Sequence, residues 1–69
     1  MISMNLKRLR KMHQYTQENI AEKINVSRQS IAKWESGESN PDIDSLIKIS
    51  KLYNVSLDNL VNHSEDEWG

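Results

Sequence analysis

The stretch from Thr16 to Gly37 constrains the fold of this chain more than any other segment. It contains two helical patterns separated by Asn25 and Val26, a connection too short for anything but a tight turn. The hydroxyls of Thr16 and Ser27 suit the position just before a helix, where they accept a hydrogen bond from a free backbone N–H. Gly37 suits the left-handed conformation that ends a helix. The segment therefore predicts two short helices joined by a single turn.

The rest of the chain is also predicted to be helical. Apolar and polar residues nowhere alternate over a useful length, which argues against strands. Apolar residues recur at helical spacing instead, as in Ile20, Ala21 and Ile24. The pattern predicts an all-α fold of five short helices, over residues 5–12, 16–24, 28–36, 42–53 and 57–61.

Three of these helices share the same local chemistry at their start. A hydrophobic residue precedes a hydroxyl cap, and an apolar residue follows four positions after the cap. This hydrophobic staple sets the angle at which the chain enters a helix. It occurs as Tyr15-Thr16 before Ile20, Val26-Ser27 before Ile31, and Val55-Ser56 before Leu60. Asn25 and Asn54 follow two of the helices, and asparagine tolerates the left-handed conformation expected there.

The 69 residues are enough for one small domain, predicted over residues 1–61. Residues 62–69 contain three consecutive acidic residues and no periodicity, so we expect an acidic, flexible C-terminal tail. The absence of cysteine excludes disulfides and fits a cytoplasmic location. Because no apolar run is long enough for a membrane span or a secretory signal, we expect no membrane association.

The net charge of -1 conceals a strong asymmetry along the chain. Residues 1–33 carry seven basic and two acidic side chains, whereas residues 34–69 carry two basic and eight acidic ones. A basic half attracts phosphates and an acidic half repels them. The distribution therefore favours a nucleic-acid partner that approaches from the N-terminal half.

The helix predicted over residues 28–36 has one polar, basic face. Each residue advances 100°, so five of its residues fall within about 140° of each other. They are Arg28, Gln29, Ala32, Lys33 and Ser36. Ile31 and Trp34 fall on the opposite side and are predicted to be buried.

This face fits the major groove of double-stranded DNA. Arg28 can give paired hydrogen bonds to guanine, Gln29 can pair with adenine, and Lys33 can reach a guanine or a phosphate. Any solvated helix also turns polar groups outward, which is the plainer explanation. The preceding helix and the tight turn favour DNA recognition.

Several other residues are candidates for a supporting role. Gln17 lies at the start of a helix, where the helix dipole favours a phosphate, and its amide can contact that phosphate or brace the recognition helix. Ser27 and Ser30 can act as caps or as groove contacts. Arg10 and Glu35 can form an ion pair between two helices, or each can be solvated separately.

Other kinds of site find little support in the sequence. His13 and His63 are far apart, without cysteine or carboxylate at ligand spacing, so no metal and no cofactor are predicted. Ser27 and Ser30 have no neighbouring histidine to activate them. A glycine-rich phosphate loop is absent, and an enzyme is therefore not expected.

The chain resembles the lambda-repressor/Cro-like helix-turn-helix domains of the XRE family, over about residues 5–61. The matching residues are Leu6, Leu9, Arg10, Thr16, Gln17, Ala21, Val26 to Ile31, Trp34, Glu35, Gly37, Pro41, Leu46, Ile49, Val55 to Leu57, and Leu60. The resemblance implies a five-helix fold with residues 28–36 as the recognition helix. It also implies groove contacts at Ser27, Arg28, Gln29 and Lys33, a phosphate contact or brace at Gln17, and an Arg10–Glu35 pair.

The chain departs from the family pattern at two kinds of position. Gln14, Asn25 and Asn54 occupy turn positions that often carry glycine, so we expect the same turns with mild strain. The loop before the fourth helix lacks the basic residues that often contact phosphates. Asn40 can still contact a phosphate there, and Ser36 can do so from the end of the recognition helix.

Together these features predict a sequence-specific DNA-binding transcriptional regulator, most simply a repressor, acting in the cytoplasm at the nucleoid. A homodimer on a palindromic site is expected. Leu52, Leu57 and Val61 can form its apolar interface, or they can be ordinary core or surface residues. The rival hypothesis is an antitoxin-like protein-interaction module, in which the acidic C-terminal half and Trp68 bind a partner protein.

Overall fold

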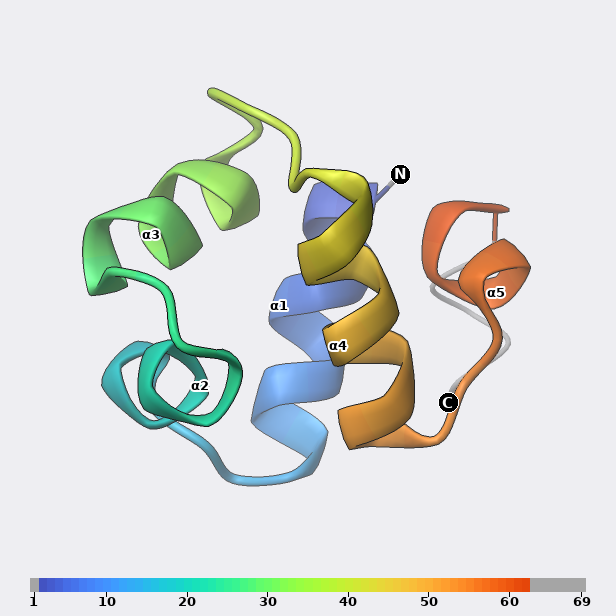
Figure 1. The fold of residues 1–69 in the computed structure, drawn as a ribbon, viewed down its shortest axis with the longest axis horizontal. Helices are drawn as coiled ribbons and strands as arrows, with labels where there is room; N and C mark the ends of the chain where they lie inside the picture. The colour runs from blue at the N-terminus through green and yellow to red at the C-terminus, as the bar shows by residue number, and fades with distance from the viewer. Residues whose placement is uncertain (1, 63–69) are drawn as a thin grey trace.

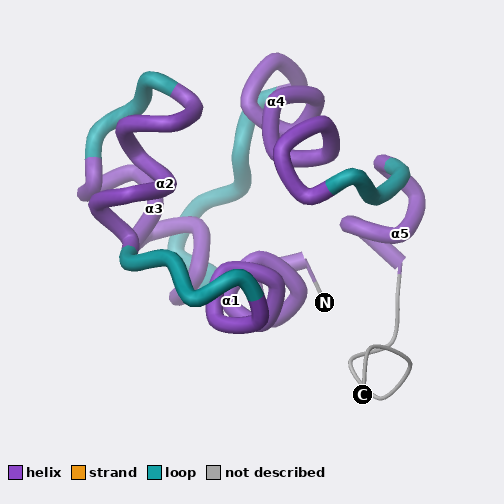
Figure 2. Tube along the Cα trace, turned by 90° about the horizontal axis from the view of Figure 1, so that it is seen from below, coloured by secondary structure: helices purple, strands orange, loops and turns teal. Residues whose placement is uncertain are grey.

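The computed structural model describes residues 2–62, and in this range five helices follow one another without a strand. They are α1 (Ile2–Met12), α2 (Gln17–Ile24), α3 (Arg28–Ser36), α4 (Ile43–Tyr53) and α5 (Leu57–Asn62). α2 and α3 lie together at one end of the molecule and α5 lies at the other, with α1 and α4 between them (Figure 1, Figure 2). The predicted all-α, five-helix fold is confirmed.

Local chemistry sets most of the helix ends. Thr16 Oγ1 accepts a hydrogen bond from Asn19 N at 3.0 Å, and Ser27 Oγ accepts one from Ser30 N at 3.1 Å. Ser56 Oγ does the same for Asn59 N at 3.0 Å, at the start of α5. These bonds satisfy backbone donors that a helix leaves free in its first turn.

The turns that end the helices have the predicted left-handed backbone. Asn25 and Asn54 have φ angles of 59° and 56°, and Gln14 has a φ of 59°. Gly37 ends α3 with a φ of 83°, where an added Cβ would be strained by the backbone conformation. The left-handed backbone at Asn25 therefore lets the chain turn directly from α2 into α3, and that at Gly37 lets the chain turn away at the end of α3.

The N-terminal helix begins earlier than the sequence pattern suggests. α1 begins at Ile2 rather than at residue 5, because tertiary packing extends it. Ser3 is buried, and Ile2 packs against the core. Asn5 has no exposed surface, and its Nδ2 donates to the Leu60 carbonyl at 2.8 Å. This polar contact ties α1 to α5.

The core draws buried apolar side chains from all five helices. Ile49 and Leu60 are among the most deeply buried residues, at 2% and 0% exposure. The residues before the hydroxyl caps, Tyr15, Val26 and Val55, are partly buried against this core, as expected for hydrophobic staples. Among residues 2–62, the buried hydrophobic residues are Leu6, Leu9, Ile20, Ala21, Ile24, Ile31, Trp34, Ile49, Tyr53 and Leu60.

The apolar residues left on the surface of α4 and α5 differ from those expected. Leu52 is partly buried and packs against the core, which agrees with the second alternative, an ordinary core residue. Leu57 and Val61 are exposed. Ile43 and Ile47 are also exposed, and we call these four exposed residues the α4–α5 apolar surface. Part of the predicted tail, residues 63–69, lies outside the described residues.

Candidate nucleic-acid interface

The outward face of α3 carries the basic and amide side chains. Arg28, Gln29 and Lys33 are all exposed. The opposite face is held by Ile31 and Trp34, which are 2% and 7% exposed. A helix with one anchored face and one free polar face presents its side-chain tips at fixed positions, as groove recognition requires.

The serines of α3 are engaged in bonds to their own helix. Ser27 Oγ and Ser30 Oγ lie 2.9 Å apart, and Ser27 caps the helix. Ser36 Oγ donates to the Lys33 carbonyl at 3.0 Å. Ser27 and Ser36 remain exposed, whereas Ser30 is half-buried. Their first role in this arrangement is therefore to support the two ends of α3.

The structure brings Arg10 and Glu35 together in a two-pronged ion pair. Arg10 Nε donates to Glu35 Oε2 at 2.7 Å, and Arg10 Nη2 donates to Glu35 Oε1 at 3.0 Å. The two side chains are only 13% and 6% exposed. These hydrogen bonds raise the pKa of Arg10, aided by the charge of Glu35 and opposed by partial burial. The pair joins α1 to the C-terminal end of α3.

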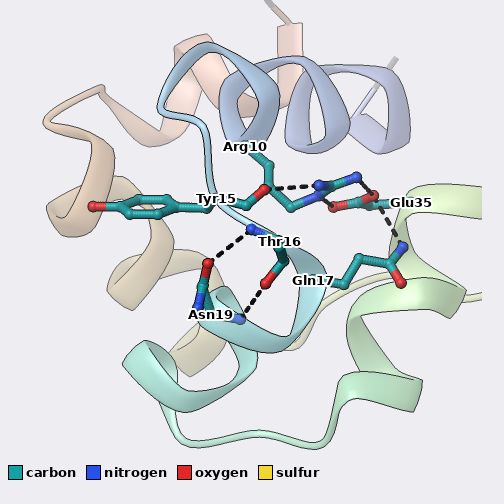
Figure 3. A network of polar contacts seen from close by, with 6 residues as sticks. All are labelled: Arg10, Tyr15, Thr16, Gln17, Asn19 and Glu35. Carbon is teal, nitrogen blue, oxygen red and sulfur yellow. Dashed lines mark hydrogen bonds and ion pairs between the residues drawn. The ribbon is translucent and has the colours of Figure 1, made fainter.

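Gln17 joins the same carboxylate from α2. Its Nε2 donates to Glu35 Oε1 at 3.2 Å (Figure 3). Arg10 Nη1 also donates to the Tyr15 carbonyl at 2.9 Å, in the loop before α2. Glu35 therefore connects α1, α2 and α3, and Gln17 acts as a brace of the recognition helix in this arrangement. We call these contacts of Arg10, Tyr15, Gln17 and Glu35 the Glu35 clamp.

Two contacts in Figure 3 could not be read from residue types alone: the bond from Arg10 to the Tyr15 carbonyl and the bond from Thr16 N to Asn19. A backbone carbonyl, such as that of Tyr15, carries no sequence signal. Asn19 Oδ1 accepts from Thr16 N at 3.0 Å, which completes a reciprocal capping box. The usual signature of that box has Glu or Gln at this position, and the shorter Asn here obscured it.

The loop between α3 and α4, which runs across from the end of one helix to the start of the other (Figure 1), contains Asn40. Asn40 is exposed, whereas the next residue, Pro41, is buried. Asp42 caps α4, and its Oδ1 accepts from Ser45 Oγ at 2.7 Å. This hydrogen bond lowers the pKa of Asp42. The capping carboxylate gives the loop a negative charge beside Asn40.

The described residues offer little for other kinds of chemistry. Within residues 2–62 no group of three or more histidine and acidic side chains is arranged to hold a metal ion. His13 instead packs against Tyr53 in a tilted arrangement with ring centroids 4.9 Å apart, and His63 lies outside the described residues. None of the helices in the described range has the length and hydrophobicity needed to cross a lipid bilayer.

Comparison with known proteins identifies relatives over nearly the whole chain. Over 60 residues the chain is 45% identical to the HTH-type transcriptional activator BcrR of Enterococcus faecalis, covering 87% of this chain and 29% of that protein. Over 65 residues it is 34% identical to the antitoxin PezA of Streptococcus pneumoniae, covering 94% and 41% respectively. The chain thus spans less than half the length of either relative.

Solved structures with the same fold include two complexes with DNA. The P22 c2 repressor bound to a synthetic operator matches with a TM-score of 0.87 and 25% identity, over 93% of this chain and 97% of that one. SinR, the master regulator for biofilm formation, matches in its DNA complex with a TM-score of 0.82 and 32% identity, over 90% and 100%.

The sequence profile of the family described as Helix-turn-helix matches residues 6–60. That range contains α2, α3 and the turn between them, together with the Glu35 clamp that holds them to α1. This chain therefore belongs to the helix-turn-helix family, in its lambda-repressor-like XRE branch.

Proposed function

We propose that this chain binds double-stranded DNA with α3 in the major groove and regulates transcription from specific sites. The observation that carries the proposal is the exposed row of Arg28, Gln29 and Lys33 on a helix whose other face is buried. The DNA complexes of P22 c2 repressor and SinR support it, since both proteins share this fold. BcrR and PezA are longer than this chain, so the assignment concerns the DNA-binding part of any larger protein.

Three side chains read the bases in this proposal. Arg28, in the first turn of α3, gives paired hydrogen bonds to guanine O6 and N7. Gln29 pairs with adenine N6 and N7, and Lys33 contacts a guanine or a phosphate one turn further along. A paired contact of this kind contributes about 1–3 kcal/mol of discrimination against the wrong base.

A second set of residues positions α3 against the DNA backbone. Gln17 sits in the first turn of α2, where the helix dipole favours a phosphate, and its amide remains tied to Glu35. Asn40 contacts a phosphate from the exposed loop after α3. The remaining supporting contacts come from hydroxyls at the ends of α3, namely Ser27, Ser30 and Ser36.

The active form in this proposal is a homodimer on a palindromic site. One small module buries too little surface for tight specific binding, so a second copy supplies affinity and selectivity. The α4–α5 apolar surface, with Ile43 at 64% exposure and Val61 at 43%, is the candidate interface. α5 lies at the opposite end of the molecule from α3 (Figure 1), and pairing through this surface is proposed to place two recognition helices at half-sites about 34 Å apart.

The direct test is selection of binding sites from a random DNA pool at two salt concentrations. We expect a palindromic consensus whose half-sites are one helical turn apart, and an affinity that falls as salt rises. The salt dependence gives the number of phosphate contacts. Recovery of random sequences at both salt concentrations would refute sequence-specific binding.

We assign the chain a regulatory rather than a catalytic role, acting in the cytoplasm at the nucleoid. Repression is the simplest outcome, because a dimer over a promoter blocks access to it. BcrR is named an activator, so the sign of regulation depends on where the site lies relative to the promoter. A reporter gene with the selected site placed within and then upstream of the promoter distinguishes the two outcomes.

The similarity to PezA favours one second candidate, an antitoxin-like role in which the chain neutralises a partner protein. The two roles make different predictions in the native host. A stoichiometric protein partner recovered by pull-down, whose activity the chain inhibits, would favour the antitoxin role. Recovery of the chain with DNA and without such a partner would favour regulation alone.

A further inference from the structure

The side-chain amide of Asn5 is buried where α1 meets α5. Asn5 has no exposed surface, and its Nδ2 donates to the Leu60 carbonyl at 2.8 Å. Leu60 lies in the last turn of α5, where a helix leaves its carbonyls without backbone donors of its own. Asn5 therefore caps the end of α5 with a hydrogen bond supplied from another helix.

The other polar atom of this amide is left unpaired within residues 2–62. Asn5 Oδ1 is buried and accepts no hydrogen bond. A buried acceptor without a donor is destabilising, and this cost offsets part of the gain from the bond to Leu60. A leucine has the same branched outline and carries no unpaired acceptor. Stability is therefore a weak reason for an asparagine here, whereas a directional hydrogen bond fixes where its partner lies.

The position of α5 depends on few other contacts. The helix is six residues long and packs mainly on α1 and α4 (Figure 1). Ser56 caps its start, and Leu60 is its one buried residue. Hydrophobic burial has no direction, and Leu57 and Val61 are further apolar residues beside Leu60. The bond from Asn5 selects among the three, because it acts on the carbonyl of Leu60.

The orientation of α5 decides which side chains it presents to a second copy of the chain. With Leu60 turned inward, Leu57 and Val61 are 38% and 43% exposed. They are four residues apart and so share one side of the helix. Both belong to the α4–α5 apolar surface, the interface proposed for the homodimer. In a twofold dimer the same patch meets itself, so a rotation of α5 displaces both halves of the interface.

We propose that Asn5 is a positioning residue for dimerisation, which holds the last turn of α5 so that Leu57 and Val61 face a second copy. The inference rests on the proposed homodimer and adds to it a residue that lies outside the interface. Because Asn5 is on α1 and fully buried, its effect on dimerisation acts through α5.

Crosslinking of single-cysteine variants of the full chain tests this orientation, since the chain has no cysteine of its own. Leu57→Cys, Val61→Cys and Asn59→Cys are each made with Asn5 intact and with Asn5→Leu, and a short bismaleimide joins the copies. Asn59 is the matched control, because it is exposed on another side of α5.

With Asn5 intact, we expect dimers to be trapped from position 57 or 61 about tenfold faster than from position 59, because crosslinking depends on proximity and orientation. With Asn5→Leu this preference should fall toward equality, while circular dichroism still shows the helical fold. An unchanged preference in Asn5→Leu would overturn the positioning role and leave the proposed homodimer intact.

Two other results would also overturn the proposal. If none of the three cysteines traps a dimer with Asn5 intact, the interface lies away from α5, and the proposed dimer surface fails together with the role of Asn5. Asn5→Ala, which adds no bulk, is the second variant. Loss of the helical fold in both Asn5→Leu and Asn5→Ala would show that Asn5 is needed for folding itself rather than for the placement of α5.

Discussion

Removal of the Glu35 carboxylate is the sharpest test of how the recognition helix is held. In a Glu35→Ala variant, Arg10 keeps its hydrogen bond to the Tyr15 carbonyl but loses both bonds to the carboxylate. Gln17 loses its partner as well. The guanidinium is left 13% exposed and without its counter-charge.

The size of the effect follows from the burial of the pair. Exposed ion pairs contribute about 0–1 kcal/mol, whereas breaking a buried pair costs about 3–5 kcal/mol. Exposures of 13% and 6% put the Arg10–Glu35 pair near the buried limit, so we expect a loss of about 2–4 kcal/mol. That is a large part of the roughly 3–10 kcal/mol expected for a domain of this size. The melting temperature should fall by about 10–25 °C.

Urea unfolding followed by circular dichroism measures this loss, in a double-mutant cycle with Arg10→Ala. The coupling free energy between the two sites should be about 1–3 kcal/mol, because removing both charges leaves neither one unpaired. Glu22→Ala is the matched control, since Glu22 is exposed on α2 and its removal should change stability by less than about 0.5 kcal/mol. The stabilising role of the Glu35 clamp would be refuted if the Glu35→Ala and Arg10→Ala losses simply added in the double mutant. It would also be refuted if Glu35→Ala cost no more stability than Glu22→Ala.

Three further predictions concern α3 and the core. Arg28→Ala should weaken binding to the selected site by about 1–3 kcal/mol and relax base choice at one position, measured by fluorescence anisotropy. An equal loss from Lys51→Ala, an exposed lysine on α4, would instead indicate a general charge effect. Trp34→Ala should cost about 3–5 kcal/mol in urea unfolding, and an unchanged midpoint would contradict its burial. Burial raises the pKa of Tyr53, so the folded state keeps the phenol proton after the unfolded chain has lost it. Stability should therefore fall as pH rises above about 10, and the added loss should disappear in Tyr53→Phe. If the unmodified chain and the Tyr53→Phe variant lost stability equally as pH rises, Tyr53 would not be the cause.

The inward and outward faces of the N-terminal helix contribute differently to stability. Arg10 points toward α3 and holds the recognition helix, whereas Lys7 and Lys11 remain exposed. Variants at the exposed lysines should therefore leave the folding stability nearly unchanged, in contrast to variants at Arg10.

The helix-turn-helix segment could be predicted closely because its signals are local. A hydroxyl cap, an Asn or Gly in the left-handed region and a 3.6-residue period each act within a few residues, so they can be read along the chain. The ends of α3 follow from Ser27 and Gly37, and its buried side follows from the spacing of Ile31 and Trp34. The early start of α1 was missed because its first turn is held by packing rather than by a cap.

The sequence alone determined the helices, their order and the polar face of α3, since these depend on neighbours in the chain. The tertiary structure decided which distant groups meet. Gln17 and Glu35 are 18 positions apart, and Asn5 and Leu60 are 55 apart, so no local spacing encodes either contact. The Arg10–Glu35 pair was suggested mainly by family resemblance, and only the structure decided that Leu52 packs inward rather than lying free at an interface. Such contacts depend on how whole helices cross, because crossing geometry is set by the sum of many side-chain contacts across the core.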